Sequence, residues 1–218
     1  MEEIKTKAIV LKTTDYGEAD KIASLFSLEY GKISAKFVGV KRAKAKLRYL
    51  IQPFSFIELE CMKRQDFYMV KTGGVIDSFP NIISDYSKTI CGYIVVDIID
   101  KILLKNKVEK DIFLLTAKAL KAIENSNPYR ATIDYIIIFF DLLGEALNLE
   151  LTEKMFLDLN LGNFSANRSE NCLEIDKKCY QNLSTDLKNE NLNKMSLRLL
   201  HNIFKAKYDI ELNSFSFL

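Results

Sequence analysis

The sequence predicts an α+β protein in which a five-stranded N-terminal barrel of the oligonucleotide-binding (OB) fold precedes an all-α C-terminal domain. Apolar residues alternate with a period of two from residue 4 to about residue 79. After Pro80 they recur every third or fourth position, as on one face of a helix. A long polar connection separates the third and fourth predicted strands, which is typical of OB barrels. We therefore expect a nucleic-acid-binding barrel domain over residues 1–80 and a helical domain over residues 81–218.

Five short runs rich in β-branched and aromatic residues predict the barrel strands. They lie near residues 4–13, 20–28, 32–40, 53–63 and 67–79. Turn-forming residues separate these runs. The pair Gly73-Gly74 inside the last run predicts a β-bulge, because a strand interior gains nothing from positions without a side chain. An SH3-like barrel is the alternative fold that this pattern leaves open.

Helical periodicity predicts four helices in the second domain. They lie near residues 82–104, 109–125, 129–147 and 194–208. Between the last two, residues 149–191 are polar, rich in asparagine and weakly periodic, so we expect an irregular insert there. Phe215 and Phe217 are among the final four residues, which predicts a tail packed against the body.

Positive charge is concentrated in one segment. Residues 30–57 contain seven Lys or Arg and no Asp or Glu, although the whole chain has a net charge of only +2. Such a patch binds a polyanion by releasing condensed counterions, and nucleic acid is the abundant cellular polyanion. The alternative is a basic loop that is only solvated. The predicted nucleic-acid contacts are Lys36, Lys41, Arg42, Lys44, Lys46 and Arg48, with Tyr49 as a stacking platform for a base.

Catalytic groups are sparse in this sequence. The single histidine, His201, lies in an apolar helical segment, where a core-edge or capping role is expected. The sequence has no phosphate-binding loop, dinucleotide fingerprint or nucleophile elbow. Acidic groups at 15–20 and 97–100 could in principle hold Mg²⁺, but acidic turns are usually solvated or capping. We predict no catalytic residue, no metal site and no cofactor.

The cysteines and the apolar segments favour a cytoplasmic protein. Cys61 and Cys91 lie in apolar contexts, as reduced thiols often do. Cys172 and Cys179 do not have the spacing of the close pairs that form a structural zinc site. The N-terminus has no signal-peptide pattern, and the apolar run 135–140 is far shorter than the ~20 residues that a membrane span requires. We expect no membrane contact.

The N-terminal third of the chain resembles RecO, a family of bacterial recombination mediators. The order and spacing of several motifs match over about the first 80 residues. These are Ala8-Ile-Val-Leu11, Asp15-Tyr-Gly-Glu18 with Asp20-Lys-Ile22, Glu29-Tyr-Gly-Lys-Ile33, Gly39 before the basic segment, and Gln52-Pro-Phe54. Further on the likeness is weaker and rests on Ser78-Phe-Pro80, Phe140-Asp-Leu142 and Leu212-Asn-Ser214.

The resemblance implies a non-enzymatic protein that binds single- and double-stranded DNA and anneals complementary strands. It also implies that the protein acts with RecR to help RecA replace the single-strand-binding protein (SSB). The family's basic positions correspond to Lys41, Arg42, Lys44, Lys46 and Arg48. Many members bind zinc through two close cysteine pairs, which this sequence lacks. Members usually also have an arginine where Phe139 stands, near the pocket for the SSB C-terminal tail. Alternative cations for that tail are Lys118, Lys121 and Arg130.

Two other functions use the same basic segment and stay open at this point. An RNA- or ribosome-binding barrel protein would discriminate through contacts to the 2′-hydroxyl. A protein-binding adaptor would use its basic face only for an acidic partner. We prefer DNA binding with strand annealing, with weak sequence preference because phosphate contacts carry no sequence information.

Overall fold

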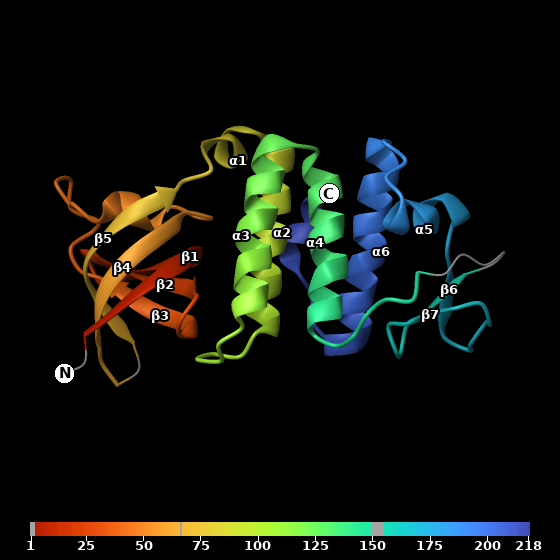
Figure 1. Ribbon diagram of the computed structural model, residues 1–218, viewed down its shortest axis with the longest axis horizontal. Helices are drawn as coiled ribbons and strands as arrows, with labels where there is room; N and C mark the ends of the chain where they lie inside the picture. Colours follow the sequence, from red (N-terminus) through yellow and green to blue (C-terminus); the bar gives the residue numbers. More distant parts are fainter. Residues whose placement is uncertain (1–2, 66, 150–154) are drawn as a thin grey trace. The chain divides into compact units, whose positions relative to one another are not determined.

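The computed structural model describes residues 3–65, 67–149 and 155–218. The chain forms two compact units. Figure 1 colours the chain along the sequence from red at the N-terminus to blue at the C-terminus. The barrel unit contains residues 1–80 and 96–120, and the helical unit contains residues 81–95 and 121–218. None of the helices in the described parts of the chain combines the length and hydropathy needed to cross a bilayer.

Five strands close the barrel in the order β1-β2-β3-β5-β4. Their bounds are β1 Glu3–Tyr16, β2 Asp20–Ser27, β3 Gly31–Phe37, β4 Phe56–Lys63 and β5 Tyr68–Asp77. Neighbouring strands are antiparallel except β3 and β5, which pair in parallel through Ala35 with Tyr68 and Lys36 with Met69. In Figure 1 these strands curl around one another in red to yellow. The predicted α+β class with a five-stranded N-terminal barrel is confirmed.

Apolar side chains fill the barrel because alternate positions of each strand point inward. Val10, Leu25 and Phe37 are completely or almost completely buried in this core. The short 3₁₀ helix η1 (Arg48–Ile51) adds Leu50 to the same core. The connection between β3 and β4 is therefore joined to the barrel interior.

Parts of two helices complete the barrel unit. They are the C-terminal part of α2 (Tyr86–Ile102) and the N-terminal part of α3 (Lys110–Asn125). The Phe113 ring of α3 lies 5.5 Å from the Phe26 ring and 5.9 Å from the Phe56 ring, measured between centroids. Such tilted and edge contacts between aromatic rings are favourable. They cover apolar side chains on the outside of the barrel.

The helical unit has its core between α4 (Pro128–Leu142) and α6 (Glu190–Tyr208). Helix α4 starts where Asn127 accepts the backbone N–H of Arg130 and a proline occupies the first turn, which is a favourable N-terminus. The Phe140 and Phe204 rings stack with centroids 4.8 Å apart. The two helices consequently lie side by side, as Figure 1 shows.

The prediction that the C-terminal part is all-α is wrong. Strands β6 (Phe156–Asp158), β7 (Phe164–Ser165) and β8 (Cys172–Glu174) form an antiparallel sheet of order β7-β6-β8, followed by α5 (Lys177–Ser184). Strands of two or three residues are too short to produce a detectable period of two. The expected irregular insert at 149–191 thus contains regular structure, apart from residues 150–154, which lie outside the described residues.

Several predicted element bounds are also wrong. The predicted helix at 82–104 is divided into α1 (Pro80–Ser84) and α2, because the Asp85 carboxylate accepts the Lys88 backbone N–H and starts a new helix. Helix α4 ends at Leu142 instead of near 147, just before Gly144, which has a left-handed φ of +77°. Of the two terminal phenylalanines, Phe215 is buried and Phe217 is exposed.

The predicted bulge at Gly73-Gly74 is wrong as well. Gly73 pairs with Leu59 and Gly74 with Glu58 in regular register, and the irregularities lie on either side of them. A Cβ at Gly73 would stand 2.5 Å from the Glu58 carbonyl oxygen and 2.6 Å from the Leu59 side chain. Glycine is therefore needed at this position for close approach, not for a bulge.

Candidate nucleic-acid interface

The basic insert, which we define as residues 38–55 between β3 and β4, is built from consecutive turns. The backbone N–H of Arg42 donates to Gly39 (3.1 Å), that of Ala45 to Arg42 (3.1 Å), and that of Arg48 to Ala45 (3.4 Å). Each turn keeps the Cα atoms of its first and fourth residues within about 7 Å. The cations of the insert are therefore held on a compact surface instead of an extended loop.

Both ends of the C-terminal half of the insert are attached to the barrel. The Tyr49 hydroxyl donates to the Gly73 carbonyl oxygen at 3.3 Å, while 52% of the tyrosine remains exposed. The Phe54 backbone N–H donates to the Val10 oxygen, and the Val10 N–H donates to the Ser55 oxygen, both at 3.0 Å. These contacts give the insert a fixed position on the barrel.

Asp20, at the start of β2, fixes the N-terminal half of the insert. Its carboxylate accepts the Gly39 backbone N–H at 2.8 Å and forms an ion pair with Lys36 at 2.9 Å. The Gly39 hydrogen bond and then the Lys36 contact hold the pKa of Asp20 below its usual value. The Lys36 ammonium also lies 4.6 Å from the centroid of the Tyr16 ring. Lys36 is thus occupied by contacts within the barrel.

Asp15, at the end of β1, holds two more lysines. Its oxygens lie 2.9 Å from the Lys41 Nζ and 3.3 Å from the Lys21 Nζ. Hydrogen bonds from Lys41 and then Lys21 hold the pKa of Asp15 below its usual value. The carboxylate is exposed, so this ion pair positions Lys41 without removing it from solvent.

The remaining cations of the insert form no close ion pair among the described residues, although the charge of Arg42 also acts on Asp20 from a longer distance. All four side chains are exposed, and no carboxylate oxygen of residues 3–65, 67–149 or 155–218 lies within 4.0 Å of them. They are Arg42, Lys44, Lys46 and Arg48. A groove of about 480 Å³ runs under the insert, bordered by Lys21, Lys41 and Arg48 together with Asp15. The arrangement can bind an anionic chain along a surface that is already rigid.

The three cations proposed from the resemblance for an SSB tail have different surroundings. Lys118 is exposed on α3. Lys121 forms an ion pair with Glu124 at 3.0 Å. Arg130 donates to the Asn182 carbonyl oxygen at 2.6 Å, to the Leu183 oxygen at 3.2 Å, and to the Asp134 carboxylate. The guanidinium of Arg130 therefore joins the end of α5 to α4, which occupies its donors.

Three of the acidic residues considered for Mg²⁺, Asp15, Asp20 and Asp100, have lysine neighbours. Asp100 accepts the Ser24 hydroxyl at 3.0 Å and pairs with Lys12 at 3.0 Å, and its backbone oxygen accepts the Lys32 ammonium. Burial raises the pKa of Asp100, but the contacts from Lys12 and Ser24 outweigh burial and hold it below the usual value. In the described parts of the chain, no three His, Cys, Asp or Glu side chains gather as metal ligands would.

His201 and Cys179 both make contacts within the helical unit that stabilise the fold. The His201 Nε2 accepts the Leu212 backbone N–H at 3.2 Å, and its ring stacks on Phe215 with centroids 4.5 Å apart. Burial lowers the pKa of His201 and raises the pKa of the Cys179 thiol. Cys179 is buried, whereas Cys172 is partly exposed on β8. His201 fastens the C-terminal segment to α6.

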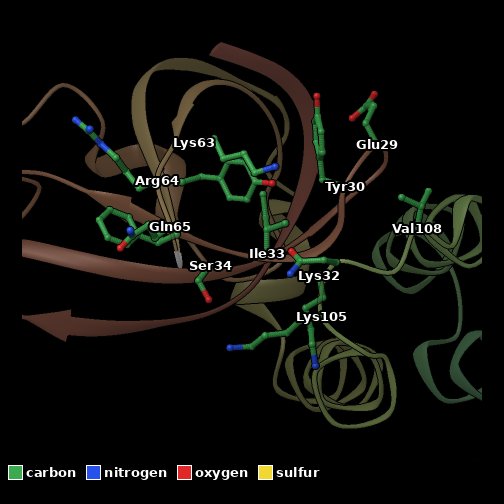
Figure 2. A pocket seen from close by; sticks show the side chains of 13 residues that line it. Glu29, Tyr30, Lys32, Ile33, Ser34, Lys63, Arg64, Gln65, Lys105 and Val108 are labelled. Atoms are coloured by element: carbon green, nitrogen blue, oxygen red, sulfur yellow. The ribbon is translucent and has the colours of Figure 1, made fainter. Parts of the chain in front are cut away.

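Sequence reasoning missed a second cationic pocket in the barrel unit. Figure 2 shows Lys63 and Arg64 at the end of β4, Lys105 in the α2–α3 connection, and Lys32 on β3 gathered around one pocket. These residues are far apart along the chain, so no local charge count brings them together. The bridge between Lys32 and Lys105 brings the α2–α3 connection to β3, and the pairing of β4 with β5 and of β5 with β3 brings the end of β4 there.

A closed five-stranded barrel with unpaired cations on a rigid insert, continuing into helices, is typical of barrel proteins that bind nucleic acid. Two family models match the chain. The model described as "Recombination protein O N terminal" matches residues 1–79, and the one described as "Recombination protein O C terminal" matches residues 83–217. The chain therefore belongs to the recombination protein O (RecO) family, as its motifs predicted.

Curated relatives with the name "DNA repair protein RecO" agree with this membership. The protein from Thermoanaerobacter sp. (strain X514) is 29% identical over 212 residues, which are 96% of this chain and 83% of that protein. The protein from Caldanaerobacter subterraneus subsp. tengcongensis is 28% identical with the same coverage. The protein from Acetivibrio thermocellus is 30% identical over 139 residues, 64% of this chain and 55% of that protein.

Proposed function

We propose that this chain is a non-enzymatic, DNA-binding mediator of recombinational repair. The observation that supports this most directly is the set of four exposed cations on the rigid basic insert that have no carboxylate within 4.0 Å among the described residues. The strand order β1-β2-β3-β5-β4, with β3 parallel to β5, supports an OB fold for the barrel. Membership of a family of DNA repair and recombination proteins agrees with this function.

The DNA contacts we propose are backbone contacts. Arg42, Lys44, Lys46 and Arg48 bind phosphates, and Lys41 contributes from its position beside Asp15. Lys36 does not bind phosphate directly in this proposal, because its charge is already paired with Asp20. It helps to hold the basic insert in place through that ion pair. The exposed ring of Tyr49 offers a face on which an unpaired base stacks. Both single- and double-stranded DNA present the phosphates that this surface needs.

Strand annealing follows from the same physics. Two complementary strands repel each other, and a protein that neutralises phosphates while leaving base edges exposed lowers the cost of their approach. In this proposal the chain acts with RecR and helps RecA replace SSB on single-stranded DNA. Lys118, Lys121 and Arg130 are the proposed contacts for the acidic SSB tail, of which Lys121 already pairs with Glu124 and Arg130 already donates to the Asn182 oxygen.

The direct test is the annealing of SSB-coated complementary oligonucleotides, with and without RecR, over a salt series. We expect the chain to accelerate annealing, and we expect the acceleration to fall steeply with salt because phosphate contacts release counterions. Equal or tighter binding of an RNA competitor would contradict the DNA assignment. Failure to bind any oligonucleotide at low salt would overturn the proposed function.

A further inference from the structure

An exposed tyrosine lies beside the start of the basic insert. Tyr16 is the last residue of β1, and 52% of it is exposed. It pairs with Asp20 across the β1–β2 hairpin, one position beyond the pair of Asp15 and Lys21, both of which border the groove under the insert. Successive residues of a strand face opposite sides of the sheet. Tyr16 and Asp20 therefore lie on the face of the hairpin that is opposite to the groove.

The Tyr16 ring is held in place through Lys36. The Lys36 ammonium lies 4.6 Å from the centroid of the ring and also pairs with the Asp20 carboxylate at 2.9 Å. The same carboxylate accepts the Gly39 backbone N–H at 2.8 Å, which connects the ring to the first turn of the insert. A cation is attracted to the face of an aromatic ring. Lys36 thus covers one face of the ring, and the exposed surface of Tyr16 leaves the other face open to a ligand.

Lys41 brings a cation of the insert next to this ring. Its ammonium contacts an Asp15 carboxylate oxygen at 2.9 Å and the Gly17 carbonyl oxygen at 3.4 Å. These two residues precede and follow Tyr16 in the chain. A phosphate bound by Lys41 would therefore lie close to the tyrosine.

Arg42 adds a second cation to the same surface. Its side chain lies along Gly39, because a Cβ at Gly39 would stand 3.9 Å from the Arg42 Cδ. Its charge also acts on the Asp20 carboxylate, and Asp20 is the residue that pairs with Tyr16. Proteins bind unpaired nucleotides by combining cations that contact phosphates with aromatic rings that stack on bases. Both kinds of side chain meet at the start of the insert.

We propose that Tyr16 is a second stacking platform for an unpaired base, serving the N-terminal half of the basic insert as Tyr49 serves the C-terminal half. The inference rests on the proposed function and deepens it, because it makes Tyr16 a residue that determines specificity for single-stranded DNA. A duplex keeps its bases stacked inside and presents its phosphates to the surface. The cations therefore bind both forms of DNA, and the two tyrosines add affinity for the unpaired form.

The test compares single-stranded with duplex DNA on the full chain. Fluorescence anisotropy at low salt, with oligothymidine and with a duplex of the same length, measures both affinities. Tyr16→Ala should lose about tenfold in affinity for oligothymidine and less than about twofold for the duplex, since one stacked base is lost. Tyr16→Phe keeps the ring and should stay within about twofold of the wild type on both.

The dependence of affinity on salt separates stacking from an ionic role. Tyr16→Ala should leave the salt slope unchanged, because no phosphate contact is removed. The matched control is Tyr86→Ala in α2, a tyrosine of the helical unit that is 71% exposed. This control should change neither affinity.

Photocrosslinking tests the wild-type chain without any variant. An oligonucleotide that contains iodouracil forms crosslinks with aromatic rings that stack on the modified base. Trypsin then releases the peptide 13–21, in which Tyr16 is the single aromatic residue, and the peptide 49–63, which begins with Tyr49. We expect crosslinks in both peptides.

The outcomes separate this inference from the proposed function. If Tyr16→Ala binds oligothymidine as tightly as the wild type, or weakens single strands and duplex equally, Tyr16 is not a stacking platform and the proposed function remains intact. Crosslinks in peptide 49–63 without any in peptide 13–21 would overturn the inference in the same way. A wild-type chain that binds no oligonucleotide at low salt would overturn the proposed function itself.

Discussion

The basic segment of the barrel has two halves that differ in their partners. In the N-terminal half, Lys32, Lys36 and Lys41 lie beside Asp100, Asp20 and Asp15. In the C-terminal half, the exposed cations from Arg42 to Arg48 have no carboxylate within 4.0 Å among the residues described. Both halves contain Lys or Arg and no Asp or Glu. Nearby acids from other elements therefore decide which cations stabilise the fold and which remain available to a ligand.

The largest expected effect comes from neutralising the unpaired half. Changing Arg42, Lys44, Lys46 and Arg48 together to Gln should weaken DNA binding roughly 100-fold at low salt and reduce the salt slope by about three units. The free energy of unfolding should hardly change, because none of these side chains forms an ion pair within 4.0 Å with a described residue. Fluorescence anisotropy over a salt series measures the affinity and the slope.

The matched control neutralises four exposed lysines elsewhere, and changes the net charge by the same amount. They are Lys101, Lys110, Lys177 and Lys178. If this control weakens DNA binding as much as the insert variant does, net charge and not the insert governs binding, and the comparison between the halves fails.

The next effect concerns the paired half. Asp100→Asn removes the charge beside Lys32, a lysine with only 9% of its side chain exposed. Breaking a buried ion pair leaves an uncompensated charge, so we expect a loss of about 3 kcal/mol in the free energy of unfolding. DNA affinity should stay unchanged. Urea denaturation measures the loss, and Glu60→Gln, which breaks the exposed Lys5–Glu60 pair, should cost under about 1 kcal/mol.

Gly73→Ala tests the attachment of the unpaired half to the barrel. The new Cβ would overlap the Glu58 carbonyl oxygen, which is backbone and cannot move aside easily. We expect a loss of about 2 kcal/mol in stability and weaker DNA binding, because η1 packs on this position. Gly74→Ala is the matched control, since a Cβ there meets nothing within 4 Å. Equal effects of the two changes on DNA affinity would contradict the attachment.

Acid should affect the paired half selectively. The folded-state pKa of Asp100 lies below its usual value, so the stability it contributes is present above about pH 4 and is lost as the pH falls further. The difference in unfolding free energy between the wild type and Asp100→Asn should stay constant from pH 8 to about pH 5 and shrink below about pH 4. Urea titrations at several pH values measure this. A difference that persists at low pH would argue against an electrostatic cause.

The smallest expected effect comes from removing the acidic partner of Lys41, which makes this lysine resemble the unpaired cations. Asp15→Asn removes the carboxylate that holds Lys41 and also removes a negative charge from the groove. DNA affinity should rise about two- to fivefold, since exposed ion pairs are weak. Anisotropy against the same oligonucleotide measures the gain. A decrease would mean that Asp15 positions Lys41 for DNA and that the paired half takes part in binding directly.

Strands and long helices were predictable because their periods are local. Five barrel strands and helices such as α4 and α6 appear where the period of two or the helical period indicates them. The sheet of β6, β7 and β8 was not predicted, since each strand is too short for a period. The glycine at 73 was recognised as unusual but misread, because its neighbour Glu58 is distant in sequence.

The sequence by itself determined the fold class, the RecO family membership and the location of the basic segment, since all three depend on patterns among nearby residues. Only the tertiary structure decided which of those cations are paired, and only it brought Lys63, Arg64 and Lys105 to one pocket. The physical reason is that ion pairs and pockets join side chains across strands and helices. Their geometry depends on strand register and barrel closure, which no local pattern contains.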